Sequence, residues 1–217
     1  MHKPRGKKAG EPAMAGIRAV IYDCDGVLID SRRANQAFYN HILKHFGRPE
    51  ITPAQMTQAQ FLTSRETIDL LFAGTPWLAE AQAYHETVDN APFLPLLSLE
   101  PHIKETLAEL RPSYRTAIAT NRGRSLPLVL ERLGLTEFFD LTVSSLDITH
   151  PKPHPECLLA VIKHFGIQPQ EALYIGDAEV DRQVAARAGV PFIAYKNPAL
   201  EAIHHLQDHL GLLQILA

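Results

Sequence analysis

The sequence predicts an α/β fold, a doubly wound parallel sheet with a helical cap domain inserted after the first strand. The sequence contains short apolar segments, which are typical of strands that are buried on both faces of a parallel sheet. Beyond residue 100 these segments alternate with helical patterns, which predicts right-handed strand–helix–strand connections. Between residues 31 and 96 only helical patterns occur, and this stretch is the predicted cap.

The first strand is predicted over Arg18–Tyr22, from its alanine, valine, isoleucine and tyrosine. Residues 1–16 before it are basic and rich in glycine, proline and alanine, so we expect a disordered tail there. Residues 31–96 carry apolar positions at helical spacing, and glycine and proline separate the segments. The predicted cap helices cover Arg32–Phe46, Ser64–Phe72 and Trp77–Val88.

Residues 17–30 and 97–217 form the predicted α/β catalytic core. Its second part begins with a helix that opens at Glu100-Pro101 and runs to Leu110, because proline is favoured in the first turn of a helix. Further strands are expected over Tyr114–Thr120, Leu141–Ser144, Ala172–Ile175 and, as the last of the sheet, Pro191–Tyr195. The helices between and around them are expected over Leu126–Leu133, Cys157–Phe165 and Val180–Ala188.

Composition narrows the classes of partner. The 217 residues are 46% hydrophobic, and a net charge of -3 with a pI near 6.4 gives no basic field for nucleic acid. No apolar stretch approaches the roughly 20 residues of a membrane helix, and no secretory signal is visible, so we expect a cytoplasmic protein. The expected partner is a small molecule, not nucleic acid or a membrane. The expected state is a monomer, with a homodimer as the alternative.

The cysteines and the C-terminal histidines give no metal signature. Cys24 and Cys157 form no CxxC pair, and both are expected to be reduced and structural. His204, His205 and His209 follow the last predicted strand, where no soft ligand accompanies them. We expect an exposed C-terminal helix there, with His205 and His209 on one face.

The most informative segment is Asp23-Cys24-Asp25-Gly26, at the end of the first predicted strand. In an extended chain, side chains two residues apart share one face, with Cα atoms roughly 6.6 Å apart. Asp23 and Asp25 are therefore expected in the crevice at the carboxyl ends of the strands, where open α/β sheets bind ligands. Two such carboxylates repel each other, and a divalent cation is the simplest compensation. A strand-ending Asp-Gly turn is the structural alternative.

Three later segments supply polar groups at predicted strand ends or between prolines. Thr120-Asn121 offers phosphate-binding donors, and Lys152 stands between two prolines just before a helix, as a point charge for a phosphate oxygen or a carboxylate. Asp177 follows a strand, and Asp181 comes one helical turn later, so both can approach a metal held by Asp23. Each segment alone also fits a turn, a solvated loop or a helix cap.

Together and in this order, the four segments resemble the signatures of the haloacid dehalogenase superfamily, and more closely its phosphoglycolate-phosphatase-like branch. The resemblance spans about residues 17–195 and includes the inserted helices, which in that branch form a mobile cap. It also includes Pro101-His102-Ile103, where relatives often have glycine in place of His102.

The resemblance implies a Mg2+-dependent phosphatase that acts on a small phosphorylated metabolite, such as a phosphoglycolate-like compound or a sugar phosphate. It implies that Asp23 forms an aspartyl-phosphate and that Asp25 protonates the leaving alcohol, for which the pKa of Asp25 should be raised. Mg2+ would be bound by the Asp23 carboxylate, the Asp25 backbone carbonyl and Asp177, with Asp181 behind them. The phosphoryl oxygens would be held by Thr120, Asn121 and Lys152.

The sequence leaves several other functions open. Asp25 disfavours carbon–halogen chemistry, and Lys44, the only lysine between residues 31 and 96, carries no sign of activation for phosphonate hydrolysis. A sugar-phosphate mutase of the phosphoglucomutase-like branch shares the core residues, and a non-catalytic phospho-ligand binding module shares the fold. Arg65, at the start of a cap helix, and Arg122, just after Asn121, are the candidates for substrate specificity.

Overall fold

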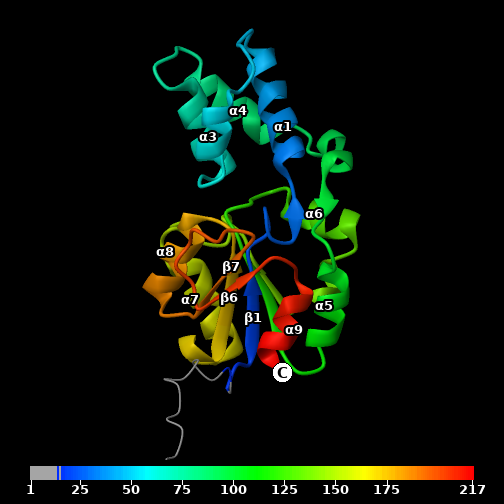
Figure 1. Ribbon diagram of the computed structural model, residues 1–217. Helices are drawn as coiled ribbons and strands as arrows, with labels where there is room; N and C mark the ends of the chain where they lie inside the picture. Colours follow the sequence, from blue (N-terminus) through cyan, green and yellow to red (C-terminus); the bar gives the residue numbers. More distant parts are fainter. Residues whose placement is uncertain (1–13, 15) are drawn as a thin grey trace, which may run out of the picture.

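The computed structural model describes residue 14 and residues 16–217, and its central feature is a six-stranded parallel sheet (Figure 1). The expected tail, residues 1–16, lies almost wholly outside the described residues. The strand order is β5-β4-β1-β6-β7-β8, so the chain crosses from one side of β1 to the other between β5 and β6. The predicted doubly wound α/β class is confirmed. The strands are β1 (Ala19–Tyr22), β4 (Arg115–Ala119), β5 (Leu141–Val143), β6 (Ala172–Gly176), β7 (Phe192–Tyr195) and β8 (His204–Leu206).

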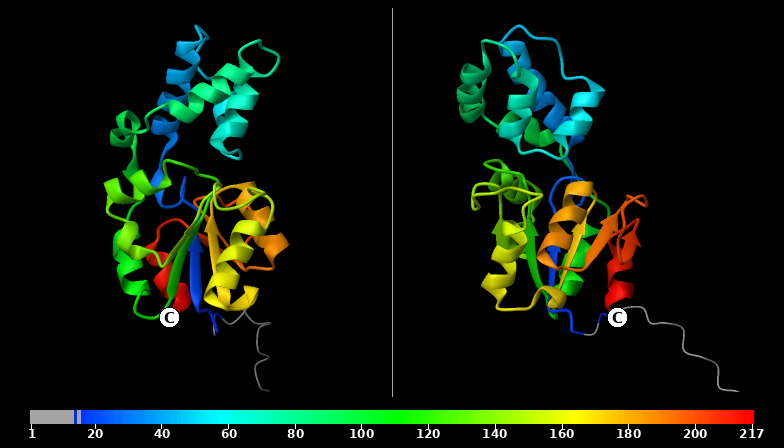
Figure 2. Two further views of the ribbon diagram at one scale, coloured as in Figure 1. Left: turned by 180° about the vertical axis from the view of Figure 1, so that it is seen from behind. Right: turned by 90° about the vertical axis from the view of Figure 1, so that its left-hand side faces the viewer.

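Helices cover both faces of the sheet (Figures 1 and 2). One face packs against α5 (Ile103–Leu110), α6 (Leu126–Leu133) and α9 (Leu210–Leu216). The other face packs against α7 (Glu156–Phe165) and α8 (Glu179–Ala188). Short 3-10 turns, η2 (Thr136–Phe138) and η3 (Pro169–Glu171), precede β5 and β6. Among the described residues, no helix combines the length and apolarity that a membrane crossing needs.

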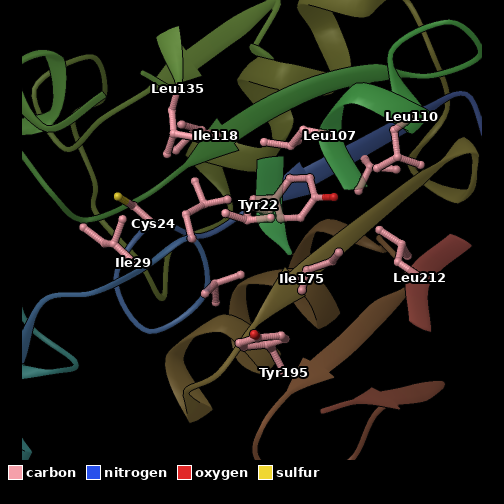
Figure 3. Packing of buried hydrophobic residues seen from close by; sticks show 14 of the residues in the cluster. Tyr22, Cys24, Ile29, Leu107, Leu110, Ile118, Leu135, Ile175, Tyr195 and Leu212 are labelled. Carbon is pink, nitrogen blue, oxygen red and sulfur yellow. The ribbon is translucent and has the colours of Figure 1, made fainter. Parts of the chain in front are cut away.

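The central strand shows why apolar runs without alternation form this sheet. Side chains of a strand alternate between its two faces. Val20 and Tyr22 of β1 therefore join the cluster under α5, α6 and α9, which Figure 3 shows, whereas Ala19 and Ile21 join the cluster under α7 and α8. All four are fully buried. A strand between two helical layers needs apolar residues at every position, and this requirement produces the continuous pattern.

The inserted segment folds into a helical unit beyond the carboxyl ends of the strands (Figure 1). This helical cap consists of α1 (Arg32–His45), α2 (Pro53–Ala59), α3 (Ser64–Phe72), α4 (Leu78–Thr87) and the 3-10 helix η1 (Ala91–Leu96). It has a hydrophobic cluster of its own, separate from both clusters of the sheet, with Phe38, Ile42, Ile68, Leu71 and Phe72 among its members. The cap therefore holds its shape through its own packing.

Two short strands connect the cap with the core. Ile29–Asp30 (β2) pairs antiparallel with Ser98–Leu99 (β3), so the outgoing and returning chains run side by side. The predicted boundaries, after residue 30 and before residue 97, fall beside this ribbon. Strands of two residues leave no pattern in a sequence, and the ribbon was not predicted.

Two predicted elements were wrong in detail. The helix expected to open at Glu100-Pro101 begins only at Ile103, because His102 adopts a left-handed conformation with φ 59°. Glycine takes that conformation without steric cost, whereas a residue with a Cβ adopts it less readily. Pro191–Tyr195 is also not the last strand, since His204–Leu206 pairs with β7 at the edge of the sheet. The three C-terminal histidines therefore do not lie on an exposed helix.

His209 is buried, whereas the sequence predicted an exposed helix for it. Its side chain is fully buried at the start of α9, where its ring stacks on Tyr195 at 4.3 Å between ring centroids. Its Nε2 lies 2.7 Å from the carbonyl oxygen of Val27, to which the neutral ring donates. Burial lowers the pKa of His209 to about 4, so the ring is neutral in the folded protein at neutral pH.

His209 should make the protein sensitive to acid. The unfolded chain takes up a proton on this residue below its ordinary pKa of 6.5, whereas the folded chain does so only below about 4. Its contribution to the free energy of unfolding is therefore complete above pH 6.5 and is lost as pH falls toward 4, in total about 3 kcal/mol. Urea unfolding at several pH values measures this. His209→Gln should show a shallower loss over that range, and identical slopes for both proteins would contradict the assignment.

Candidate functional site

The candidate site lies where the order of the strands reverses. Asp23 follows β1, Thr120 follows β4 and Asp177 follows β6, and β1 lies between the other two strands. In open α/β sheets this crevice at the carboxyl ends of the strands is where ligands bind. A cavity of about 840 Å3 opens there between the core and the cap, and all three residues line it. Its volume is within the range of small-molecule sites.

Three carboxylates meet at the floor of the crevice. One oxygen each of Asp23, Asp177 and Asp181 lies within 4.8 Å of the others. Burial, assisted by the neighbouring carboxylates, raises the pKa of Asp23 to about 7 and that of Asp177 to about 8. Such a cluster disfavours its own negative charge, and a divalent cation would compensate for it.

The Lys152 side chain forms ion pairs with two of these three carboxylates. Its Nζ donates to Asp23 Oδ1 and to Asp181 Oδ1, both at 2.7 Å, and lies 2.8 Å from the Tyr174 hydroxyl. Burial opposes its charge, but the carboxylates of Asp181 and Asp23 outweigh burial and raise the pKa of Lys152. Lys152 is therefore a permanent, buried cation beside Asp23, not a solvated loop lysine.

Asp181 and Tyr174 contact Lys152 and each other on the buried side of the carboxylate cluster. Asp181 is fully buried, accepts from the Tyr174 hydroxyl at 2.8 Å and does not line the cavity. The Tyr174 hydroxyl also lies 3.1 Å from the carbonyl oxygen of Ala119 at the end of β4. Sequence reasoning missed Tyr174. The available signal was a phenol inside an otherwise apolar buried strand, since a buried tyrosine hydroxyl normally requires a partner.

Asp25 lies in an environment that differs from the predicted one. Arg122 donates from Nε to Asp25 Oδ2 at 3.0 Å and from its terminal nitrogen to Oδ1 at 2.5 Å. Burial opposes the charge of Asp25, but the guanidinium outweighs burial and lowers the pKa of this carboxyl. The expectation of a raised pKa is therefore wrong for this arrangement. Arg122 also contacts Ser125 of the core at 2.7 Å and Asn35 of α1 at 3.3 Å, and the contact with Asn35 ties this ion pair to the cap.

Asn121 has a positioning contact that the sequence did not reveal. Its Oδ1 accepts from the backbone N–H of Lys152 at 2.9 Å, and its Nδ2 donates to the Lys152 carbonyl oxygen at 3.3 Å. This amide side chain therefore also clamps the Lys152 loop. Thr120 accepts from the Arg122 backbone N–H at 3.1 Å and lines the cavity with Asn121.

The cap and the loop after β4 together contribute a second group of charges to the cavity. Arg65, on α3, lies 3.8 Å from Glu86, and Arg124, from the loop after β4, lies 3.4 Å from the same carboxylate. Arg124 also donates to the carbonyl oxygens of His85 and Glu86 near the carboxyl end of α4, the first of these at 2.8 Å. Both arginines line the cavity, as does Arg122. Sequence reasoning selected Arg65 and Arg122 but missed Arg124.

The residues present fit a magnesium ion. Mg2+ prefers oxygen ligands from one or two carboxylates and retains several waters. Asp23 and Asp177 supply such oxygens at the cavity surface, and Gly26 keeps the space beside them open. A Cβ on Gly26 would lie 2.2 Å from Asp177 Oδ2, and the φ of +78° at this position also favours glycine.

Comparisons with known proteins find relatives over most of the chain. A family model described as haloacid dehalogenase-like hydrolase matches residues 20–195. Phosphoglycolate phosphatase from Nitrosospira multiformis is 30% identical over 190 residues, and the match covers 80% of each chain. Pyrophosphatase PpaX from Oceanobacillus iheyensis is 27% identical over 180 residues, covering 80% of this chain and 81% of the relative.

Solved structures show the same architecture. The crystal structure of a HAD-superfamily hydrolase of subfamily IA, variant 1, from Geobacter sulfurreducens is similar with a TM-score of 0.77 and 40% identity. The match covers 93% of this chain and 97% of that one, so the likeness includes the cap as well as the sheet.

Proposed function

Because the chain belongs to the haloacid dehalogenase-like hydrolases, in the phosphoglycolate-phosphatase-like branch, we propose that it is a Mg2+-dependent phosphatase of small phosphorylated metabolites. One observation carries the proposal: Asp23 lies at the surface of the cavity, in contact with a buried lysine and within a cluster of three carboxylates. A binding module would need neither a nucleophile nor a cation fixed beside it.

In the proposed reaction, the Asp23 carboxylate attacks phosphorus and the bond from phosphorus to the leaving oxygen breaks. Water then hydrolyses the resulting aspartyl-phosphate to inorganic phosphate and the free Asp23 carboxylate. Lys152 orients Asp23 and neutralises charge on the transferred group, while Thr120 and Asn121 line the path of the phosphoryl oxygens. Mg2+, held by Asp23 and Asp177, would stabilise the negative charge that develops at phosphorus.

Asp25 is the proposed donor of a proton to the leaving oxygen, and Arg122 sets a condition on that role. While the guanidinium is paired with it, Asp25 stays ionised and has no proton to give. Proton donation therefore requires Arg122 to move away from the carboxylate. Because Arg122 also contacts Asn35 on α1, movement of the cap is the natural cause of that release.

Three arginines of the cavity, each paired here with a carboxylate of the cavity wall, support a substrate with a second anionic group that would replace such a partner. Arg65, Arg122 and Arg124 line the cavity in addition to Lys152. Phosphoglycolate and sugar bisphosphates have such a group, and so does pyrophosphate, the substrate named for PpaX of Oceanobacillus iheyensis. We propose a carboxylated or doubly phosphorylated small molecule as the preferred substrate, with pyrophosphate as the second candidate. A cytoplasmic, monomeric enzyme remains part of this proposal.

Phosphate release from para-nitrophenyl phosphate with Mg2+, and its loss with a chelator, tests the activity itself. A panel of phosphoglycolate, sugar phosphates and pyrophosphate, compared by kcat/KM, tests the substrate. A mutase would instead require a bisphosphate activator and release little inorganic phosphate. Absence of release across metals and pH would support the non-catalytic module.

Gly26→Ala tests the magnesium site separately from the nucleophile. The added methyl group has to displace the Asp177 carboxylate, so we expect Mg2+ activation to require roughly 10- to 100-fold more Mg2+. Gly166→Ala is the matched control, because its φ of +63° is similar but no atom lies within 4 Å of the added Cβ. Both variants should lose about 1 kcal/mol of stability from backbone strain. Equal Mg2+ requirements in the two variants would contradict the placement of Asp177.

A further inference from the structure

A second group of metal-ligating side chains lies on the loop that carries Lys152. His150, His154 and Glu156 each place one ligand atom within 4.8 Å of the others. The Nδ1 atoms of His150 and His154 lie 2.9 and 3.8 Å from the same Glu156 oxygen, Oε2. None of these three side chains lines the cavity between core and cap. The cluster is therefore distinct from the carboxylates around Asp23.

The loop holds this cluster in a fixed arrangement. Pro151 and Pro153 restrict the backbone between the two histidines, and Pro155 restricts it between His154 and Glu156. The Glu156 carboxylate accepts from the backbone N–H groups of Thr149 at 2.9 Å and His150 at 3.0 Å. The carboxylate is thus anchored. The two imidazoles are exposed, at 62% and 50% of their side-chain surface, and their ring centroids lie 4.6 Å apart, with His150 Nδ1 in hydrogen-bond contact with the Glu156 carboxylate.

We propose that His150, His154 and Glu156 form a binding site for a divalent transition-metal ion such as Zn2+ or Co2+. Two imidazoles and one carboxylate suit these ions, whereas Mg2+ prefers oxygen ligands alone. Around a tetrahedral ion with bonds near 2.0–2.1 Å, ligand atoms lie about 3.3 Å apart. The present separations from Glu156, 2.9 and 3.8 Å, require only small rotations of the rings. The exposed fourth position is available to water.

Such an ion would act on the segment that positions Lys152. His150 and His154 flank Lys152 at two residues on either side, so one ion bound by both closes the loop around it. The Lys152 backbone is already clamped by Asn121, and its Nζ contacts Asp23. Metal binding would therefore restrict the motion of the loop from its outer side. The site itself does not depend on the proposed phosphatase activity.

Co2+ is the sharpest probe, because a four-coordinate Co2+ ion absorbs visible light far more strongly than the hydrated ion. The full-length protein is titrated with Co2+ in excess Mg2+, which occupies the carboxylates around Asp23, and Zn2+ binding is measured by calorimetry. We expect one Co2+ equivalent with nitrogen-ligand bands. His154→Gln should weaken its affinity by more than the roughly tenfold that loss of a supporting contact costs.

Two further variants make the result decisive. His164→Gln changes an exposed histidine on α7 that is outside the cluster, and it should bind Co2+ like the wild type. Asp177→Asn removes a carboxylate of the other cluster and should also retain the absorption bands. Unchanged Co2+ affinity in His154→Gln, or loss of the bands in Asp177→Asn instead, would overturn the proposal. Circular dichroism of each variant verifies that it is folded.

Discussion

Asp23→Asn is expected to abolish turnover, with kcat on any phosphomonoester reduced by at least about a thousandfold. An amide cannot attack phosphorus and form the acyl phosphate, whereas the shape of the side chain is kept. The fold should not suffer. Lys152 keeps its contact with Asp181, and one of three crowded carboxylates is neutralised. Thermal unfolding should therefore occur at the wild-type temperature or slightly above it.

The measurement combines phosphate release with chemical trapping. Acid-quenched wild-type enzyme should retain radiolabelled phosphate on Asp23, and the variant should retain none. Asp69→Asn is the matched control, because Asp69 binds Gln82 within the cap and does not line the cavity. It should keep both the activity and the trapped phosphate. A well-folded Asp23→Asn protein with substantial turnover would refute the role of Asp23 as the nucleophile.

The sequence predicted the sheet well because burial on both faces leaves a strong local signal. Ala172–Gly176 is buried throughout, and Arg115–Ala119 is buried from Thr116 onward. The first of these strands extends one residue beyond its predicted range, and the second is one residue shorter than predicted at each end. His204–Leu206 has no such signal, since this edge strand is formed mainly by its pairing with β7. Without that strand, its histidines were assigned to a helix. Pro53–Ala59 also escaped prediction, because this cap helix buries no residue and shows no apolar periodicity.

The sequence indicated which residues form the site, but not which of their side chains contact one another. Asp23, Lys152 and Asp177 each occupy a strand end or a loop restricted by prolines, and such positions follow from local pattern. The contact between Arg122 and Asp25 joins residues 97 positions apart, and its effect on the Asp25 pKa depends on a geometry that only the fold supplies. The clamp of Asn121 on the Lys152 loop is equally non-local.

Lys152→Met is expected to show the second large effect, on stability as well as on activity. Methionine fills a similar volume but leaves the buried carboxylates of Asp23 and Asp181 without their cation. Loss of one partner from a buried ion pair typically costs 3–5 kcal/mol, and we expect about that reduction in the free energy of unfolding. Activity should be lost as well, because Asp23 is no longer oriented.

A second substitution separates these two effects. Lys152→Met combined with Asp181→Asn removes one uncompensated charge, so stability should recover by at least about 1 kcal/mol while activity stays absent.

The Lys152→Met protein should also be relatively more stable at pH 5 than at pH 8. Burial raises the pKa of Asp23 in the folded state, and loss of the lysine removes the cation that opposes this shift, so protonation of Asp23 favours folding at low pH and that contribution is lost as pH rises. Urea unfolding of the four proteins of this cycle, at both pH values, gives the coupling energy. A coupling near zero would mean that Lys152 and Asp181 do not act as a pair, and that the buried cation stabilises the site through Asp23 alone.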